Sequence, residues 1–231
     1  HLALVRVAGV VKIFCNGTQC LSVANTSSFS GASEIAIGCR ATGTTQSFNG
    51  YIDDLRITKG IARYTASFKP PSLPNPTGHD PYAGKVVLHL PMDGVDNGTV
   101  LSESTGKTIT VYGNTSTKVA QSKFNGSSAY FDGTADYLSF TDVDLNTSDF
   151  TVEAFINVSA GLATVTHEIF WSGPNTSAGR GFAIGTNVAW GSGIRMRWYI
   201  GTDVFTPIVP IIQGQWHHVC VSRYTGTLYF F

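Results

Sequence analysis

Apolar and polar residues alternate with a period of two along most of the chain, and no long helical period appears. In FTVEAFINV, residues 150–158, one face carries Phe150, Val152, Ala154, Ile156 and Val158. Further strands are expected at 2–7, 10–14, 34–38, 51–57, 137–140, 181–185, 194–201, 217–223 and 227–231, between Gly, Asn, Ser and Pro residues. Many short strands with little helix predict an all-β fold of two packed antiparallel sheets.

The first and last of these strands are similar to each other. HLALVRVAGVVKIF, residues 1–14, aligns without gaps with HVCVSRYTGTLYFF, residues 218–231. Four positions are identical, namely His1, Arg6, Gly9 and Phe14 with His218, Arg223, Gly226 and Phe231. The offset from residue 1 to residue 218 is 217 residues, and a match at such a spacing indicates an internal repeat.

A proline-rich stretch interrupts the strand pattern. KPPSLPNPTGHDPYAG, residues 69–84, contains five prolines and cannot join a sheet ladder. It predicts an extended, exposed linker. The chain therefore divides into residues 1–71, a linker at 72–84, and residues 85–231.

The segment FNGYIDDLRITKGIARYTASFKPP, residues 48–71, resembles the last strand and exit of a laminin-G-like, concanavalin A-type jelly-roll domain. Such domains occur in tandem in viral tail fibres and large secreted proteins. VVLHLPMDG (86–94), SKFNGSSAYFDGTADYLSF (122–140), DFTVEAFINV (149–158) and GQWHHVCVSR (214–223) resemble successive strands of the same family. The resemblance implies a two-sheet antiparallel jelly roll, with residues 1–71 similar to its C-terminal half and residues 85–231 to its N-terminal part.

Two interpretations follow from this order. In the first, the chain spans parts of two consecutive tandem domains. In the second, residues 1–71 and 85–217 close one permuted domain, and residues 218–231 are a surplus strand for donation to a neighbour. Both predict copies of the chain, or adjacent repeats, as partners in an end-to-end filament.

Composition narrows the class of partner. Only 13% of residues are charged and the formal net charge is zero, which argues against nucleic acid as a partner. No apolar run approaches the roughly 18 residues needed to span a bilayer, so no membrane insertion is expected. Eight of the eleven asparagines begin a glycosylation sequon: Asn16, Asn25, Asn97, Asn114, Asn125, Asn146, Asn157 and Asn175. We expect an extracellular glycoprotein, although Asn-Gly turn chemistry is an alternative explanation for some sequons.

Cys15 and Cys20 flank the sequence NGTQ, where a four-residue loop would place them opposite each other for a disulfide. A two-residue turn at Asn16 and Gly17 would instead leave them on a diagonal that is too long. We predict the disulfide and keep the diagonal as the alternative.

Catalytic chemistry is not expected. Glucanases that resemble this family carry E-x-D-x-x-E on a strand, whereas TVEAF offers only Glu153, which is expected to be solvated or paired with an arginine. The resemblance also implies a structural calcium ion between Asp53 and Asp93, because Ca²⁺ takes carboxylate and carbonyl oxygens. The alternative is ordinary ion pairing, with Asp54 bound to Arg56, or capping of a turn.

Carbohydrate binding is the other function that the resemblance implies. Trp190, in the turn-like NVAWGSG, is the expected exposed aromatic platform for a sugar. We therefore expect a structural repeat module of an extracellular fibre, with recognition of cell-surface glycans as the alternative.

Overall fold

The computed structural model describes residues 2–7, 9–24, 35–40, 46–72, 74, 80–141, 149–159, 161, 166–173, 180–185, 194–199, 203–205, 211–225 and 227–230. Strands make up nearly all the regular structure of these residues, together with one short 3-10 turn, η1 (Ala83–Lys85). Over the same residues we find no helical segment with the length and hydrophobicity of a membrane span. The all-β prediction is confirmed.

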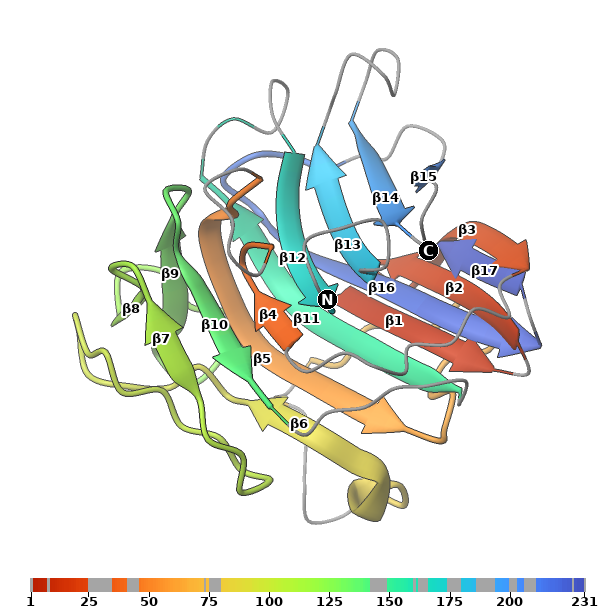
Figure 1. Cartoon of the computed structure of the whole chain (residues 1–231), viewed down its shortest axis with the longest axis horizontal. Coiled ribbons are helices and arrows are strands. Elements are labelled where there is room, and N and C mark those ends of the chain that lie inside the picture. The colour runs from red at the N-terminus through yellow and green to blue at the C-terminus, as the bar shows by residue number, and fades with distance from the viewer. Residues whose placement is uncertain are drawn as a thin grey trace.

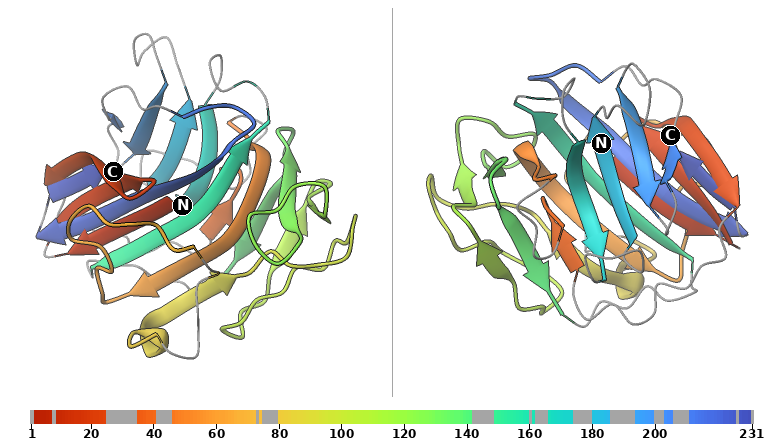
Figure 2. Two further views of the ribbon diagram at one scale, coloured as in Figure 1. Left: turned by 180° about the vertical axis from the view of Figure 1, so that it is seen from behind. Right: turned by 45° about the horizontal axis from the view of Figure 1, so that its top comes forward.

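The described strands form two sheets that pack face to face (Figure 1). In order of pairing, the larger sheet contains β3 (Thr18–Ala24), β2 (Gly9–Cys15), β17 (Thr227–Phe230), β16 (Trp216–Thr225), β1 (Leu2–Val7), β11 (Phe150–Val158), β5 (Asn49–Lys59), β9 (Ser128–Asp132) and β8 (Ser116–Lys118), with β6 (Val86–Leu90) also on β5. Seen from behind, β5, β11 and β16 run side by side across it (Figure 2). Neighbours are antiparallel, except where β1 meets β16 and β2 meets β17.

The smaller sheet contains the remaining described strands. In order they are β15 (Asp203–Phe205), β14 (Arg195–Tyr199), β13 (Arg180–Gly185), β12 (Thr166–Ser172), β4 (Ile35–Ile37), β10 (Tyr137–Phe140) and β7 (Thr110–Tyr112). β4 lies between β12 and β10, so an N-terminal strand sits in the middle of a sheet built from later strands.

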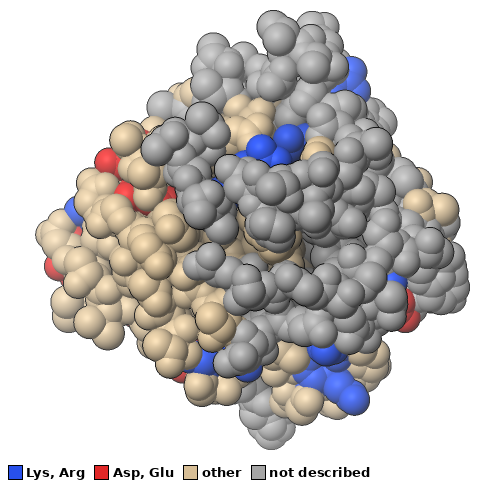
Figure 3. All heavy atoms as spheres, in the orientation of Figure 1, with Lys and Arg blue, Asp and Glu red and all other residues tan. Residues whose placement is uncertain are grey.

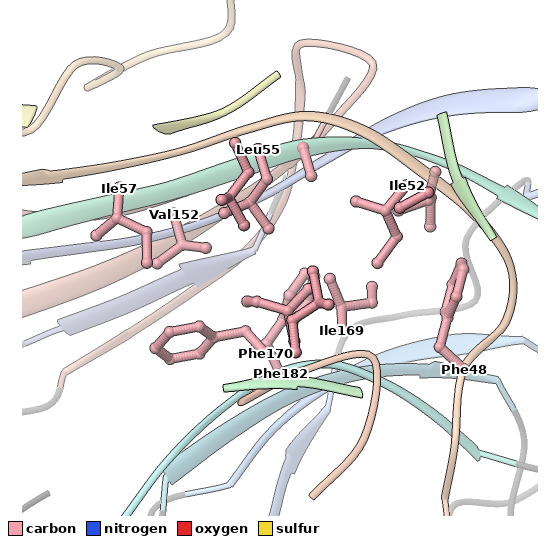
Figure 4. Close-up of a cluster of buried hydrophobic side chains, with 14 of the residues drawn as sticks. Phe48, Ile52, Leu55, Ile57, Val152, Ile169, Phe170 and Phe182 are labelled. Atoms are coloured by element: carbon pink, nitrogen blue, oxygen red, sulfur yellow. The ribbon is translucent and has the colours of Figure 1, made fainter. Parts of the chain in front are cut away.

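The hydrophobic core fills the space between the sheets. Figure 4 shows Ile52, Leu55, Ile57 and Val152 from the larger sheet facing Ile169, Phe170 and Phe182 from the smaller one. The predicted alternation of β11 is confirmed, because Phe150, Val152, Ala154, Ile156 and Val158 all belong to this core. Each large apolar side chain buried here contributes about 1.5 to 3 kcal/mol.

Residues 1–71 and 85–231 pair with each other in the larger sheet, and the division of the chain into domains stays a prediction. β1 is hydrogen-bonded to β11, and β5 to both β6 and β9. The core also takes side chains from both segments, such as Ile13 and Leu88. Together the two segments make one sandwich, since the apolar face of each needs the other for cover.

The segment that leaves β5, residues 60–71, folds back over the outer face of the larger sheet. Tyr64 stacks on Phe68 at 3.6 Å between ring centroids, and both pack with Ala62 on Ala3, Val5 and Phe14. The Phe68 amide donates to the Gly17 carbonyl oxygen at 2.8 Å. We call residues 60–71 the closing segment, because it covers the hairpin of β1 and β2.

Candidate functional site

Two carboxylates predicted to bind calcium reach the same loop. Asp53 projects from β5, and its Oδ2 accepts hydrogen bonds from the amides of Lys123 at 2.8 Å and Phe124 at 2.9 Å. Asp93 follows β6, and its Oδ2 accepts from Nδ2 of Asn125 at 3.2 Å. Consecutive loop residues therefore hold both side chains.

The electrostatics of this acidic site favour a cation. Burial, aided by the charges of Asp54 and Asp93, raises the pKa of Asp53 to about 7 despite its two amide hydrogen bonds. Burial, with Asp54, also raises the pKa of Asp93. The Oδ1 atoms of Asp53 and Asp93 are both buried and have no hydrogen-bond partner. Two such oxygens fit a hard ion such as Ca²⁺, which binds oxygen ligands.

The site supplies only part of a calcium shell from carboxylates. Within the residues that the structure describes, no group of three or more His, Cys, Asp or Glu side chains could surround a metal. A bound Ca²⁺ would therefore complete its six to eight ligands with carbonyl oxygens, amide oxygens or water.

Asp54 does not pair with Arg56, as the alternative for this stretch predicted. Its backbone adopts φ = 50° within β5, and its Oδ1 lies 2.9 Å from Nε2 of His89. Nδ1 of His89 lies 2.8 Å from Oγ of Ser104. Sequence reasoning missed this Ser–His–Asp chain, since alternation along a strand does not reveal a residue with positive φ.

The chain Ser104–His89–Asp54 has the order of a nucleophilic triad but not its surroundings. The Ser104 amide donates to the His89 carbonyl oxygen, and the Glu103 carboxylate accepts from the amides of Thr105 and Lys107. Those amides, which would stabilise an oxyanion, are engaged by a negative charge. The arrangement fastens the loop after β6 to β5.

Glu153 is paired, as expected. Its Oε1 accepts from Nη2 of Arg56 at 2.6 Å and Nε at 3.0 Å. Arg63 of the closing segment binds Asp80 through two hydrogen bonds, of 2.9 and 2.5 Å, and Arg56 lies 3.5 Å from the same carboxylate. This buried network joins β5, β11, the closing segment and the linker.

A second buried ion pair lies beneath aromatic rings on the smaller sheet. Glu168 pairs with Arg197 and lies 3.7 Å from Nε of Arg40. The Arg40 guanidinium stands 4.1 Å over the ring of Trp171, which stacks with Tyr199. Figure 3 shows Lys or Arg atoms at the surface over this sheet. Trp171 is fully buried, whereas Tyr199 is half-buried.

The predicted disulfide does not form. Asn16 and Gly17 make a two-residue turn with φ of 50° and 82°, so Cys15 pairs opposite Thr18 rather than Cys20. Cys15 is buried, Cys20 is half-buried, and no disulfide joins them. Trp190 lies outside the described residues.

The predicted glycosylation sites fall into three groups. Asn16, Asn97, Asn114 and Asn125 are exposed. Asn25, Asn146 and Asn175 lie outside the described residues. Asn157 is only 3% exposed and donates to the Gly214 carbonyl oxygen at 3.3 Å, so the folded protein has no room for a glycan there.

The family model for the concanavalin A-like lectin/glucanases superfamily, of the laminin-G-like type, matches residues 1–62 and 132–231. The chain belongs to this family, and the resemblance predicted from its sequence is confirmed. No curated protein and no solved structure shows a significant match to the chain.

Proposed function

We propose that the chain is a structural module, repeated along an extracellular fibre and joined end to end with further copies. One observation carries this proposal. Leu2 of β1 and Val219 of β16 both pair with Ala154 of β11, although they lie 217 residues apart. The two copies of the repeated sequence, residues 1–14 and 218–231, are therefore assigned to the same place beside β11.

The division of the core supports the same role. Residues 1–71 contribute Ile13, Ile37 and Phe48 to the core, and residues 85–231 contribute Phe131 and Phe170. Neither segment can cover its own apolar face, so each requires a complementary segment from the same chain or another copy. The same complementarity, used between segments of different copies, would join modules along a fibre.

We further propose that the module is not an enzyme and that a calcium ion stabilises it. The only glutamate on the outer face of β11, Glu153, is engaged by Arg56. Asp53 and Asp93 would hold the ion, which would neutralise two carboxylates whose Oδ1 atoms are buried, at the junction of β5 with the loop after β6.

Sedimentation velocity over a hundredfold concentration range tests the structural role, with electron microscopy of the most concentrated sample. We expect the weight-average mass to rise with concentration and linear particles to appear. A monomer at every concentration would contradict the proposal.

Recognition of glycans on a cell surface is the second candidate. The observation that favours it is the half-buried Tyr199, which stacks on the buried Trp171 beside Arg40, because an accessible aromatic ring next to a charged group suits sugar binding. A glycan array probed with wild type, Tyr199→Ala and Trp190→Ala tests it. Binding that either variant abolishes would favour recognition, and an array without signal would exclude it.

A further inference from the structure

Four asparagines of the chain are followed directly by glycine, namely Asn16, Asn49, Asn97 and Asn125. An asparagine side chain reacts most readily with its own backbone in this sequence, because a following residue without a side chain leaves its amide nitrogen accessible. That nitrogen attacks Cγ of the asparagine, so it must be unbonded and the side chain must be able to turn towards it. The fold decides which of the four asparagines meets these conditions.

Burial and hydrogen bonds protect Asn16 and Asn49. The glycine after each of them is buried. Oδ1 of Asn16 accepts a hydrogen bond from the His218 amide, and Nδ2 of Asn49 donates to the Asp132 carbonyl oxygen at 2.7 Å. Neither side chain can therefore turn towards its own backbone without breaking a contact that the fold supplies.

Asn97 is exposed but is also held. The Gly98 amide donates to the Val95 carbonyl oxygen at 2.9 Å, so the attacking nitrogen is already engaged. Nδ2 of Asn97 donates to Oδ2 of Asp96 at 2.9 Å, and Oδ1 accepts a hydrogen bond from Nζ of Lys118. The reaction at this position would first have to break these hydrogen bonds.

Asn125 is the exception. Both Asn125 and Gly126 are exposed, and nothing lies within 4 Å of a Cβ position on Gly126. Over the part of the chain that the structure describes, no group accepts a hydrogen bond from the Gly126 amide. The hydrogen bond from Nδ2 of Asn125 to Oδ2 of Asp93 is 3.2 Å long, at the upper limit of ordinary lengths. The attacking nitrogen is therefore available and the side chain is weakly held.

We propose that Asn125 is a site of spontaneous deamidation and that the product completes the calcium site beside it. The Gly126 nitrogen bonds to Cγ of Asn125 and gives up its proton, and the side-chain nitrogen leaves with that proton as ammonia. Water then opens the resulting cyclic imide at either carbonyl, which yields an aspartate or an isoaspartate. Nothing is oxidised or reduced, and both products carry a carboxylate in place of an amide.

The new carboxylate would stand in the acidic site. Nδ2 of Asn125, the atom that leaves, lies 3.2 Å from Asp93, and the two preceding residues, Lys123 and Phe124, hold Asp53 through their amides. An oxygen in place of Nδ2 turns a donor into a third charged acceptor. Because charged oxygen ligands set the affinity for Ca²⁺, deamidation should strengthen calcium binding and, without calcium, add repulsion. This inference rests on the proposed calcium site.

Peptide mapping by mass spectrometry tests the modification. The full-length chain is made in bacteria, so that no glycan occupies Nδ2, and is aged in mildly alkaline buffer. We expect Asn125 to react about tenfold or more faster than Asn16, Asn49 or Asn97, with isoaspartate detected by enzymatic methylation. In urea all four should react at similar rates, because each precedes a glycine. Equal rates in the folded protein, or the same preference in urea, would overturn the assignment.

Calorimetric titration with Ca²⁺ tests the consequence. Asn125→Asp should bind calcium about tenfold or more tightly than freshly prepared wild type. Asn114→Asp is the matched control, because Nδ2 of Asn114 also donates to a carboxylate, Oδ2 of Asp132 at 3.0 Å. Asp132 lies at the opposite end of β9 from the loop of Asn125, so the control should leave the affinity unchanged.

The outcomes separate this inference from the calcium site itself. Equal affinity in the wild type and Asn125→Asp would overturn the completion of the site and leave the site in place. An equal gain in Asn114→Asp would assign the effect to general charge and would also overturn it. Absence of binding in the wild type alone would contradict the proposed site but support its completion by Asn125→Asp. Absence of binding in both proteins would overturn both.

Discussion

The left-handed backbone conformation of Gly17 lets the turn between β2 and β3 approach the closing segment closely. Gly17 has φ = 82°, a region that side chains disfavour, and a Cβ at this position would lie 1.9 Å from the Phe68 carbonyl oxygen. The Gly17 carbonyl oxygen in turn accepts the Phe68 amide. A residue without a side chain is therefore required for this close approach.

We predict that Gly17→Ala destabilises the protein by about 2 kcal/mol more than Gly126→Ala does. Gly126 follows Asn125 in a turn with φ = 86°, and nothing lies within 4 Å of its Cβ position. Both substitutions strain the backbone to a similar degree, but only Gly17→Ala adds a steric clash with Phe68. Urea denaturation measures both, and equal losses would contradict the close contact with Phe68.

Asp53 makes stability depend on pH. Its pKa is about 7 in the folded protein and 3.8 as the ordinary value, so the folded state binds the proton more tightly between these values. We predict that the free energy of unfolding decreases as pH rises from about 4 to about 7, and that Asp53→Asn weakens this dependence because it removes the contribution of Asp53. Thermal denaturation in EGTA across this range measures it.

Calcium should reverse this trend, because it binds the ionised carboxylates. We expect Ca²⁺ to raise the melting temperature more above pH 7 than below it in the wild type, and to have no such effect in Asp53→Asn. An equal gain in both proteins would place calcium binding elsewhere.

The contacts of individual side chains were the part of the site that the sequence predicted least well. The resemblance pointed to Asp53 and Asp93, which do meet at one loop. It gave no sign that Asp54 turns to His89, since a positive φ in a strand depends on the surrounding packing. The turn at Gly17 likewise decided the cysteine geometry, which their spacing alone left open.

At the scale of elements, a buried ion pair connects β5 to β11. Arg56 and Glu153 are almost fully buried, and the closing segment covers them with Arg63. Charges placed in such surroundings depend on each other, because removal of one leaves the other buried without compensation.

We predict that Glu153→Gln lowers the free energy of unfolding by about 3 to 5 kcal/mol. The double variant Arg56→Met/Glu153→Gln should recover part of this loss, since it removes both charges. Chemical denaturation of the wild type, both single variants and the double variant gives the coupling. Simple additivity would contradict the interdependence of the pair.

Strand positions were predicted better than strand partners. The alternation of β11 identified its core face, because burial between two sheets imposes a period of two. Partners such as β4 between β10 and β12 depend on contacts between residues far apart in the chain, which local patterns do not record.

At the scale of the whole molecule, the surface decides which sequons can carry glycans. When the protein passes through a eukaryotic secretory pathway, we predict modification at the exposed Asn16, Asn97, Asn114 and Asn125 and none at the buried Asn157. Intact-mass analysis before and after enzymatic glycan removal measures this. Asn157→Gln should leave the glycan mass unchanged, whereas Asn114→Gln should reduce it by one chain.

The pairing of β1 with β11 also sets the order of events during synthesis. Leu2 must wait for Ala154 to emerge from the ribosome, a delay of about 8 to 30 seconds at usual translation speeds. During this interval β1 lacks its final partner, β11. Nascent chains on one polysome would thus meet while β1 is not yet paired with its own β11, which allows assembly to begin before release.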